Sequence, residues 1–273
     1  MKPAPFTYAR ATSLAQAIEL LAIEPDARLI AGGQSLGPML NLRLARPTQL
    51  IDIKRAADLR ALDADSRHLR FGACWTHAEI EDGTIEDCTA GLLPHVAHGI
   101  AYRAVRNRGT VGGSLAHADP AADWLTTMAV LDAAIIIQGA SGARRSPAME
   151  FVQGPFATSL AAGDVIAAIE VPRLSSTARW GYQKICRKTG EFARAIGAVL
   201  FDERSGLARV VCGATGGAPI VLPRTAARLA EAGASAAADM VADEIISLKA
   251  TPPLHAVAVR RALAQLATPR GMA

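Results

Sequence analysis

Two glycine pairs carry the clearest chemical signal in the sequence. The first, Gly32 and Gly33, follows the short apolar run 29–31 and precedes Ser35 and Pro38. Glycine can adopt φ > 0 and lets a ligand approach the main chain, and successive N–H groups in such a turn form an anion-binding concavity. Pro38 suits the first position of a helix. The stretch predicts a strand that runs into an anion-binding loop, and the alternative is an ordinary turn.

The second glycine pair lies between two hydroxyl residues. Gly112 and Gly113 stand between Thr110 and Ser114 in the run 106–114, which predicts a second glycine loop. In the segment that follows, Asp119 and Pro120 predict a helix N-cap and a first helical residue, for a helix over 120–131. Two glycine loops near helix starts suit one ligand that carries two phosphates.

Residues 31–36 and 109–114, with Asp119 and Asp123 following, resemble the FAD-binding medium subunit of molybdenum hydroxylases. This family includes the flavin subunits of carbon monoxide dehydrogenase and nicotine dehydrogenase and the flavin domain of xanthine dehydrogenase. The resemblance covers nearly the whole chain and is most specific at the two glycine stretches. It implies an α+β chain with a PCMH-type FAD-binding fold. Two α/β subdomains would hold FAD, and a C-terminal α+β subdomain would carry a three-stranded antiparallel sheet.

The resemblance also implies a set of FAD-binding residues, and neither a catalytic residue nor a metal ligand is assigned. The set is Leu29, Ile30, Ala31, Gly32, Gly33, Gln34, Ser35, Leu36, Ala101, Thr110, Val111, Gly112, Gly113, Ser114, Asp123, Leu160, Lys184 and Phe192. Asp123 would bind a flavin-linked hydroxyl, or else complement the dipole of its helix. Lys184 would lie near the flavin ring or pyrophosphate, or else be a solvated lysine on a strand edge.

Two residues depart from the pattern of this family. Ser114 stands where many members have Asn or Asp, and Phe192 stands where many have a Tyr beside the isoalloxazine. Phenylalanine keeps the apolar surface and lacks the hydroxyl, so the departure bears on flavin tuning and oxidant access. His117 lies inside the second motif, where it could meet the cofactor or serve as a cap.

Composition narrows the class of protein. The 273 residues are 51% hydrophobic and 20% charged, with a net charge of +4. The sequence has no basic patch rich in aromatic residues, so binding to nucleic acid is not expected. No apolar run approaches the roughly 18 residues that a membrane span needs. The N-terminus lacks the apolar region of a signal peptide, so we expect a cytoplasmic protein. The four cysteines fit neither a zinc site nor an iron–sulfur cluster, and we expect reduced thiols.

Hydrophobic periodicity and turn residues predict three parts, over 1–55, 56–175 and 176–273. In the first part we expect a helix that is capped by Thr12 or Ser13 and runs to about Ile23. We also expect two parallel strands, over 28–31 and 48–53, with a helix over 38–44 between them. In the second part Thr76 and Glu79 form a capping-box pattern. The other elements expected there are a hairpin over 59–63 and 69–74, helices over 90–101 and 148–152, and strands over 133–138 and 165–171. In the third part we expect strands over 180–186, 193–201 and 208–214 and helices over 225–232, 236–246 and 254–267.

The leading hypothesis is an electron-transfer subunit that holds one FAD. By resemblance, a partner subunit would carry 2Fe–2S clusters and a large partner subunit would carry the molybdopterin cofactor and oxidise the substrate. The complex would be a heterotrimer or a dimer of heterotrimers. Two alternatives stay open: a self-contained FAD-dependent oxidase, and a structural subunit that has lost FAD.

Overall fold

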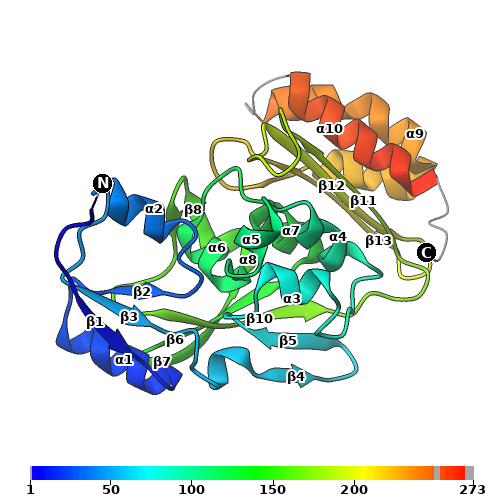
Figure 1. The fold of residues 1–273 in the computed structure, drawn as a ribbon. Coiled ribbons are helices and arrows are strands. Elements are labelled where there is room, and N and C mark those ends of the chain that lie inside the picture. The colour runs from blue at the N-terminus through cyan, green and yellow to red at the C-terminus, as the bar shows by residue number, and fades with distance from the viewer. Residues whose placement is uncertain (1, 249–252, 268–273) are drawn as a thin grey trace.

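Three main β-sheets follow one another along the chain in the computed structural model, which describes residues 2–248 and 253–267 (Figure 1). The first sheet has the order β1-β3-β2 and is parallel throughout, with β1 at Thr7–Arg10, β2 at Arg28–Ile30 and β3 at Gln49–Asp52. The predicted parallel pairing of the second and third strands is confirmed. Strand β1 was not predicted, because its residues are mostly exposed and form no apolar run.

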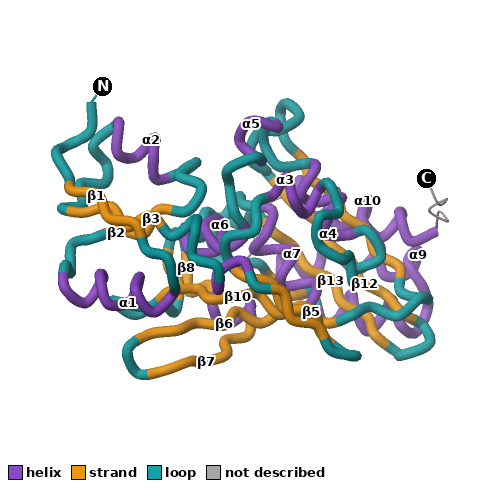
Figure 2. Tube along the Cα trace, turned by 60° about the horizontal axis from the view of Figure 1, so that its bottom comes forward, coloured by secondary structure: helices purple, strands orange, loops and turns teal. Residues whose placement is uncertain are grey.

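Two helices cover the opposite faces of the first sheet (Figure 2). Helix α1 spans Leu14–Ile23, and the Ser13 hydroxyl accepts a hydrogen bond from the Gln16 N–H at its start, as predicted. Helix α2 spans Leu36–Asn41. Pro38 is therefore the third residue of this helix, and the prediction that it begins the helix is wrong. The chain enters the helix earlier, at Leu36, after a turn at Gln34 and Ser35.

The middle sheet is antiparallel, with the order β4-β5-β10-β6-β7. Its strands span Leu62–Ala64, His68–Gly72, Val165–Pro172, Ala134–Gly139 and Gly142–Pro147 in that order, and a small sheet pairs β8 (Val152–Gly154) with β9 (Ala157–Thr158). The hairpin of β4 and β5 and the strands β6 and β10 were predicted. The edge strand β7 was not predicted, because it is largely exposed and rich in arginine.

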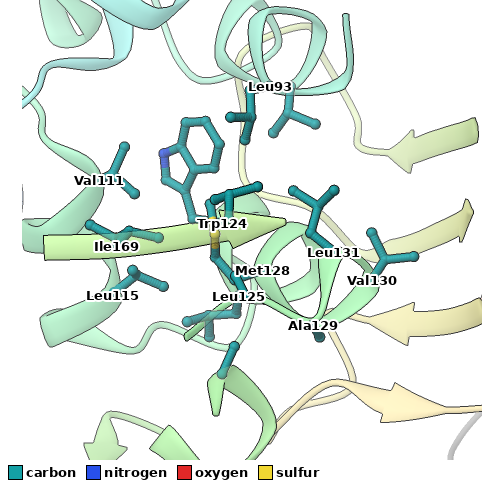
Figure 3. Close-up of a cluster of buried hydrophobic side chains, with 14 of the residues drawn as sticks. Leu93, Val111, Leu115, Trp124, Leu125, Met128, Ala129, Val130, Leu131 and Ile169 are labelled. Carbon is teal, nitrogen blue, oxygen red and sulfur yellow. The ribbon is translucent and has the colours of Figure 1, made fainter. Parts of the chain in front are cut away.

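Short helices cover one face of the middle sheet. They are α3 (His77–Glu81), α4 (Leu92–His98), α5 (Arg103–Arg106), α6 (Val111–His117), α7 (Asp123–Leu131) and α8 (Ala148–Phe151), whereas η1 (Asp58–Arg60) packs at Gly72 on the other face. Every residue of α7 is buried, since this helix lies between the middle sheet and the C-terminal sheet. Its Trp124 and Met128 pack with Val111 and Leu115 of α6 and Ile169 of β10 (Figure 3).

The structure corrects two predictions about the second glycine stretch. Residues 111–117 form helix α6, not a loop, because Thr110 caps the helix through a hydrogen bond from the Gly113 N–H to its hydroxyl. Asp119 is not an N-cap, and α7 begins at Asp123 instead of Pro120. The Asp119 carboxylate accepts a hydrogen bond from the Ala121 N–H at 2.9 Å, and this local turn delays the start of the helix.

The C-terminal sheet is antiparallel, with four strands where three were predicted. They are β11 (Arg179–Ile185), β12 (Ala195–Asp202), β13 (Leu207–Gly213) and the short β14 (Ile220–Val221). Helices α9 (Pro223–Ser247) and α10 (Pro253–Ala264), followed by η2 (Gln265–Ala267), pack on the face opposite α7 (Figure 1). No helix of the described residues is long and apolar enough to cross a membrane.

Helix α9 consists of two halves, as the sequence predicts. Gly233 breaks it with a φ of 80°. The buried Glu244 carboxylate accepts hydrogen bonds from the Thr225 N–H at 2.7 Å and the Thr225 hydroxyl at 2.6 Å. The second half therefore caps the N-terminus of the first.

Candidate functional site

The first glycine pair forms a loop whose backbone donors are free. Gly33 has a φ of 71°, which glycine adopts without strain. Within the part of the chain that the structure describes, the N–H groups of Gly32, Gly33, Gln34 and Ser35 donate to no protein acceptor. The loop closes through its carbonyls: Gly37 N–H donates to Gly33 O at 2.8 Å, and Gln34 Nε2 donates to Gly32 O at 3.0 Å. Four successive free donors in a turn suit a bound anion.

The two glycine stretches lie side by side. A Cβ placed on Gly32 would stand 2.0 Å from the Arg108 carbonyl oxygen and 2.8 Å from the Gly109 Cα. Main chain therefore packs on main chain, with no space for a side chain between them. The fold brings together two segments about 75 residues apart, and the N-terminal sheet meets the middle part of the chain at this contact.

The second glycine pair offers no free backbone donors. Val111 N–H donates to Trp75 O at 3.2 Å, Gly112 N–H to Ala73 O at 3.0 Å, and Ser114 N–H to Thr110 O at 3.0 Å. The Gly113 N–H donates to the Thr110 hydroxyl at 3.0 Å. Gly112 is needed for packing, because a Cβ there would stand 2.4 Å from the Ala73 Cβ. This segment supports the site as a packed wall.

His77 lies behind the second stretch and fixes its start. Its backbone N–H donates to Gly109 O at 2.9 Å, and its Nδ1 accepts a hydrogen bond from the Trp124 indole at 3.1 Å. Burial, aided by the nearby Arg106 charge, lowers the pKa of His77 to about 4. The imidazole is therefore neutral near pH 7, with its proton on Nε2.

Asp123 and Lys184 form a buried ion pair at the start of α7. Lys184 Nζ lies 2.8 Å from one Asp123 carboxylate oxygen, and the Tyr182 hydroxyl donates to the other at 2.8 Å. Burial raises the pKa of Asp123, and Lys184 and Tyr182 oppose that rise. Burial and the Asp123 charge raise the pKa of Tyr182 well above its usual value, so its hydroxyl stays protonated. The Lys184 charge is balanced inside the protein, and Lys184 is not a solvated lysine on a strand edge.

Three further predicted site residues, Ala101, Phe192 and Leu160, lie in other segments of the chain. Ala101 has a φ of 45°, and Gly190 packs against its carbonyl. Phe192, in the loop that contains Gly190, is 64% exposed. Leu160 is partly buried against the main core, and its N–H donates to the Thr158 hydroxyl at 3.3 Å. Ala101 lies in the turn whose Gly99 carbonyl accepts a hydrogen bond from Lys184 Nζ, at 3.2 Å.

Sequence reasoning did not single out Tyr182, His77 or Arg106. The capping box at Thr76 is confirmed and places His77 at the first position of α3, which was the available signal for that residue. Tyr182 stands two residues before Lys184 on β11, so the alternation of a strand puts both side chains on one face. Arg106 opens the second motif, but its buried pairing with Glu81 depends on the tertiary fold.

No group of three or more His, Cys, Asp or Glu that could hold a metal ion occurs among the described residues. Cys74, Cys88 and Cys212 are free and buried. Burial raises the pKa of each thiol, to about 12, 11 and 12 in that order.

Comparison with known proteins identifies the family. A family model described as the FAD binding domain in molybdopterin dehydrogenase matches residues 4–174. The glyceraldehyde dehydrogenase medium chain of Sulfolobus acidocaldarius is 37% identical over 195 residues, which cover 71% of this chain and 69% of that protein. The carbon monoxide dehydrogenase medium chain of Hydrogenophaga pseudoflava is 34% identical over 254 residues, which cover 91% of this chain and 88% of that protein.

Solved structures agree with this assignment. A chain of quinoline 2-oxidoreductase from Pseudomonas putida 86 matches with a TM-score of 0.88 and 32% identity, covering 97% of this chain and 98% of that chain. A chain of carbon monoxide dehydrogenase from Hydrogenophaga pseudoflava matches with a TM-score of 0.89 and 31% identity, with the same coverage. The resemblance read from the two glycine stretches is confirmed, and the chain belongs to the family of FAD-binding domains of molybdopterin dehydrogenases, whose members are subunits of oxidoreductase complexes.

Proposed function

We propose that this chain is the FAD-carrying electron-transfer subunit of a multi-subunit molybdenum hydroxylase. It passes electrons from a 2Fe–2S cluster on a small partner subunit to an external acceptor. A large partner subunit with the molybdopterin cofactor oxidises the substrate. The assembly is a heterotrimer or a dimer of heterotrimers in the cytoplasm. Within this chain, 1–55 and 56–175 hold FAD and 176–273 closes the site.

The names of the relatives support the subunit role. Several are called medium chains or subunits of dehydrogenases for carbon monoxide, glyceraldehyde or caffeine, and one is called the medium subunit of nicotine 6-hydroxylase. These substrates differ widely, while the chains align with this one over most of its length. A conserved flavin module that serves different substrate-oxidising partners accounts for this combination.

The observation that carries the proposal is the run of free N–H groups from Gly32 to Ser35. FAD carries a pyrophosphate, and a turn of backbone donors fits that group without a charged side chain. We therefore assign residues 31–36 as the pyrophosphate cradle. Residues 110–114, which pack beside it through Gly109, form its wall.

The other assigned residues surround the rest of the cofactor. When bound, FAD supplies the redox chemistry, accepting and releasing electrons one or two at a time. Tyr182 and Lys184 bond both oxygens of Asp123 and so fix the carboxylate that we assign to a flavin-linked hydroxyl. Ala101, Leu160 and Phe192 would line the isoalloxazine site, together with Leu29 and Ile30 at the end of β2.

Two measurements test the proposal. The purified chain should be yellow and should release FAD, not FMN, on denaturation. The chain alone should not reduce a dye with any organic substrate, whereas the chain assembled with its co-expressed partners should do so. Substantial turnover by the chain alone would contradict the subunit role and favour a self-contained oxidase. A colourless chain that fails to take up FAD would favour the structural alternative.

A further inference from the structure

Two buried cations hold three successive carbonyls of the turn at residues 99–101. Lys184 Nζ donates to Gly99 O at 3.2 Å. Arg106 Nη1 donates to Ile100 O and to Ala101 O, each at 3.1 Å. Ala101 has a φ of 45°, a left-handed conformation that costs a non-glycine residue about 1–2 kcal/mol. The two side chains therefore stabilise a turn that the residue at position 101 does not favour.

Glu81 fixes the Arg106 guanidinium. Arg106 Nε lies 2.6 Å from one Glu81 carboxylate oxygen, and Nη2 lies 3.0 Å from the other. The two side chains are only 10% and 12% exposed. A two-pronged pair of this kind restricts the guanidinium to one plane. With Nε and Nη2 on Glu81, Nη1 is directed at the two carbonyls.

The turn also supports the loop that carries Phe192. A Cβ on Gly190 would stand 2.8 Å from the Ala101 carbonyl oxygen, so the two backbones are in close contact. A shift of Ala101 would displace this loop. Arg106 therefore controls two of the segments assigned to the isoalloxazine, although it lies behind them.

We propose that Arg106 is a positioning residue for the flavin: it holds the turn at Ile100 and Ala101 in the left-handed geometry that the isoalloxazine site requires. This inference rests on the proposed function, because it takes Ala101 as part of the FAD site. Without Arg106, two carbonyls lose their donor and Ala101 can relax to negative φ. Free carbonyl dipoles beside the ring would disfavour added electrons on the flavin.

The test compares Arg106→Gln with Arg103→Gln in the purified chain. Arg103 is a matched control, because it also pairs with Glu81, at 3.0 Å, while its other hydrogen bonds reach Asp82 and Asn107 and not the turn. We expect Arg106→Gln to weaken FAD binding about tenfold, to alter the visible circular dichroism of bound FAD and to make its midpoint potential more negative. Arg103→Gln should match the parent chain in all three measurements.

A second substitution separates positioning from general loss of structure. Glycine adopts positive φ without strain, so Ala101→Gly should partly restore the potential and the dichroism in the Arg106→Gln background. A purely structural role for Arg106 predicts no such rescue. If Arg106→Gln does not fold, Glu81→Gln replaces it in the test. This substitution weakens the ion pair that orients Arg106, so it should change the dichroism and the midpoint potential in the same direction by a smaller amount.

The outcomes are distinguishable from failure of the proposed function. If the parent chain binds no FAD, the proposed function fails and the inference fails with it. If the parent binds FAD and both Arg106→Gln and Glu81→Gln keep its affinity, dichroism and potential, the positioning role is overturned while the function stands.

Discussion

The two glycine pairs have similar sequences, but their backbone N–H groups differ in hydrogen bonding. Around Gly33 the backbone N–H groups are free, and the φ of 71° makes the turn that exposes them. Around Gly112 the N–H groups already donate to protein acceptors. A glycine is required there because Ala73 occupies the space that a side chain would need. The free donors suit the first segment to the binding role proposed for it, whereas the second segment packs against protein. A glycine pair beside a serine therefore does not identify an anion site until its donors have been traced.

The contact between the two segments explains why both are needed. Gly32 lies against the backbone of Arg108 and Gly109, and Gly109 in turn lies against His77. The donor loop would have no fixed position without the packed segment behind it. Substitutions on the two sides should therefore separate ligand binding from stability.

The largest effect is expected from Gly32→Ala. The added methyl would stand 2.0 Å from the Arg108 carbonyl oxygen, so the two backbones must separate. Overpacking of this kind typically lowers the free energy of unfolding by about 1–3 kcal/mol. We expect a loss near the upper end of this range, because the backbone, unlike a side chain, cannot rotate away. We expect a large drop in melting temperature and loss of FAD retention. Gly37→Ala is the matched control, since a Cβ there meets nothing within 4 Å. Retained FAD in Gly32→Ala would show that the contact between the segments is dispensable.

How far the sequence predicts this site depends on how local each interaction is. The loop at Gly33, the capping box at Thr76 and the strand of Lys184 follow from neighbouring residues, and all three were predicted. The helix at residues 111–117 was not predicted, because two adjacent glycines lower helix propensity and only the Thr110 cap and the packing of Val111 and Leu115 offset this. The bonds that Asp123 and Arg106 make lie beyond sequence reasoning, because their partners are 59 and 25 residues away.

The next largest effect is the pH dependence of stability that His77, behind the packed segment, should cause. The pKa of His77 is about 4 in the folded protein, against the ordinary value of 6.5. The unfolded chain binds this proton more tightly, so stability falls as the pH drops from 6.5 to about 4. At about 1.4 kcal/mol per pH unit, the loss reaches about 3 kcal/mol.

His77→Gln should remove this part of the pH dependence. Denaturant unfolding of parent and variant at saturating FAD, at several pH values between 7 and 4, measures it. The variant should be less stable at pH 7, because it loses ring packing, and the two curves should converge on acidification. Carboxylate titrations are common to both proteins and cancel in the difference. Curves that stay parallel would mean that His77 binds its proton equally well in both states.

Alanine substitutions at Gly33 and Gly113 compare the two segments directly and should have a smaller effect. In Gly33→Ala the loop can relax to negative φ when free, and FAD binding must restore the left-handed turn at a cost of about 1–2 kcal/mol. FAD affinity should fall about 5- to 30-fold with little change in melting temperature. In Gly113→Ala the new Cβ meets only the Thr110 hydroxyl, at 2.9 Å, which can shift, and alanine favours the helix. Its FAD affinity should stay within about twofold. Equal losses in both variants would contradict the division into a binding segment and a packing segment.

The smallest effect should come from the cap of the packed segment. The Thr110 hydroxyl accepts the Gly113 N–H at 3.0 Å and closes the first turn of α6. Thr110→Val keeps the shape and removes the acceptor, which costs about 1 kcal/mol, a shift of about 2–4 °C in melting temperature for a chain of this size. Thr110→Ser keeps the acceptor and should stay close to the parent. If residues 110–114 act as a wall, FAD affinity should be almost unchanged in Thr110→Val. Thr110→Val also leaves the Gly113 N–H without its protein acceptor. Tighter FAD binding in Thr110→Val would contradict the wall assignment, because it would show that this N–H can donate to the cofactor once the cap is removed.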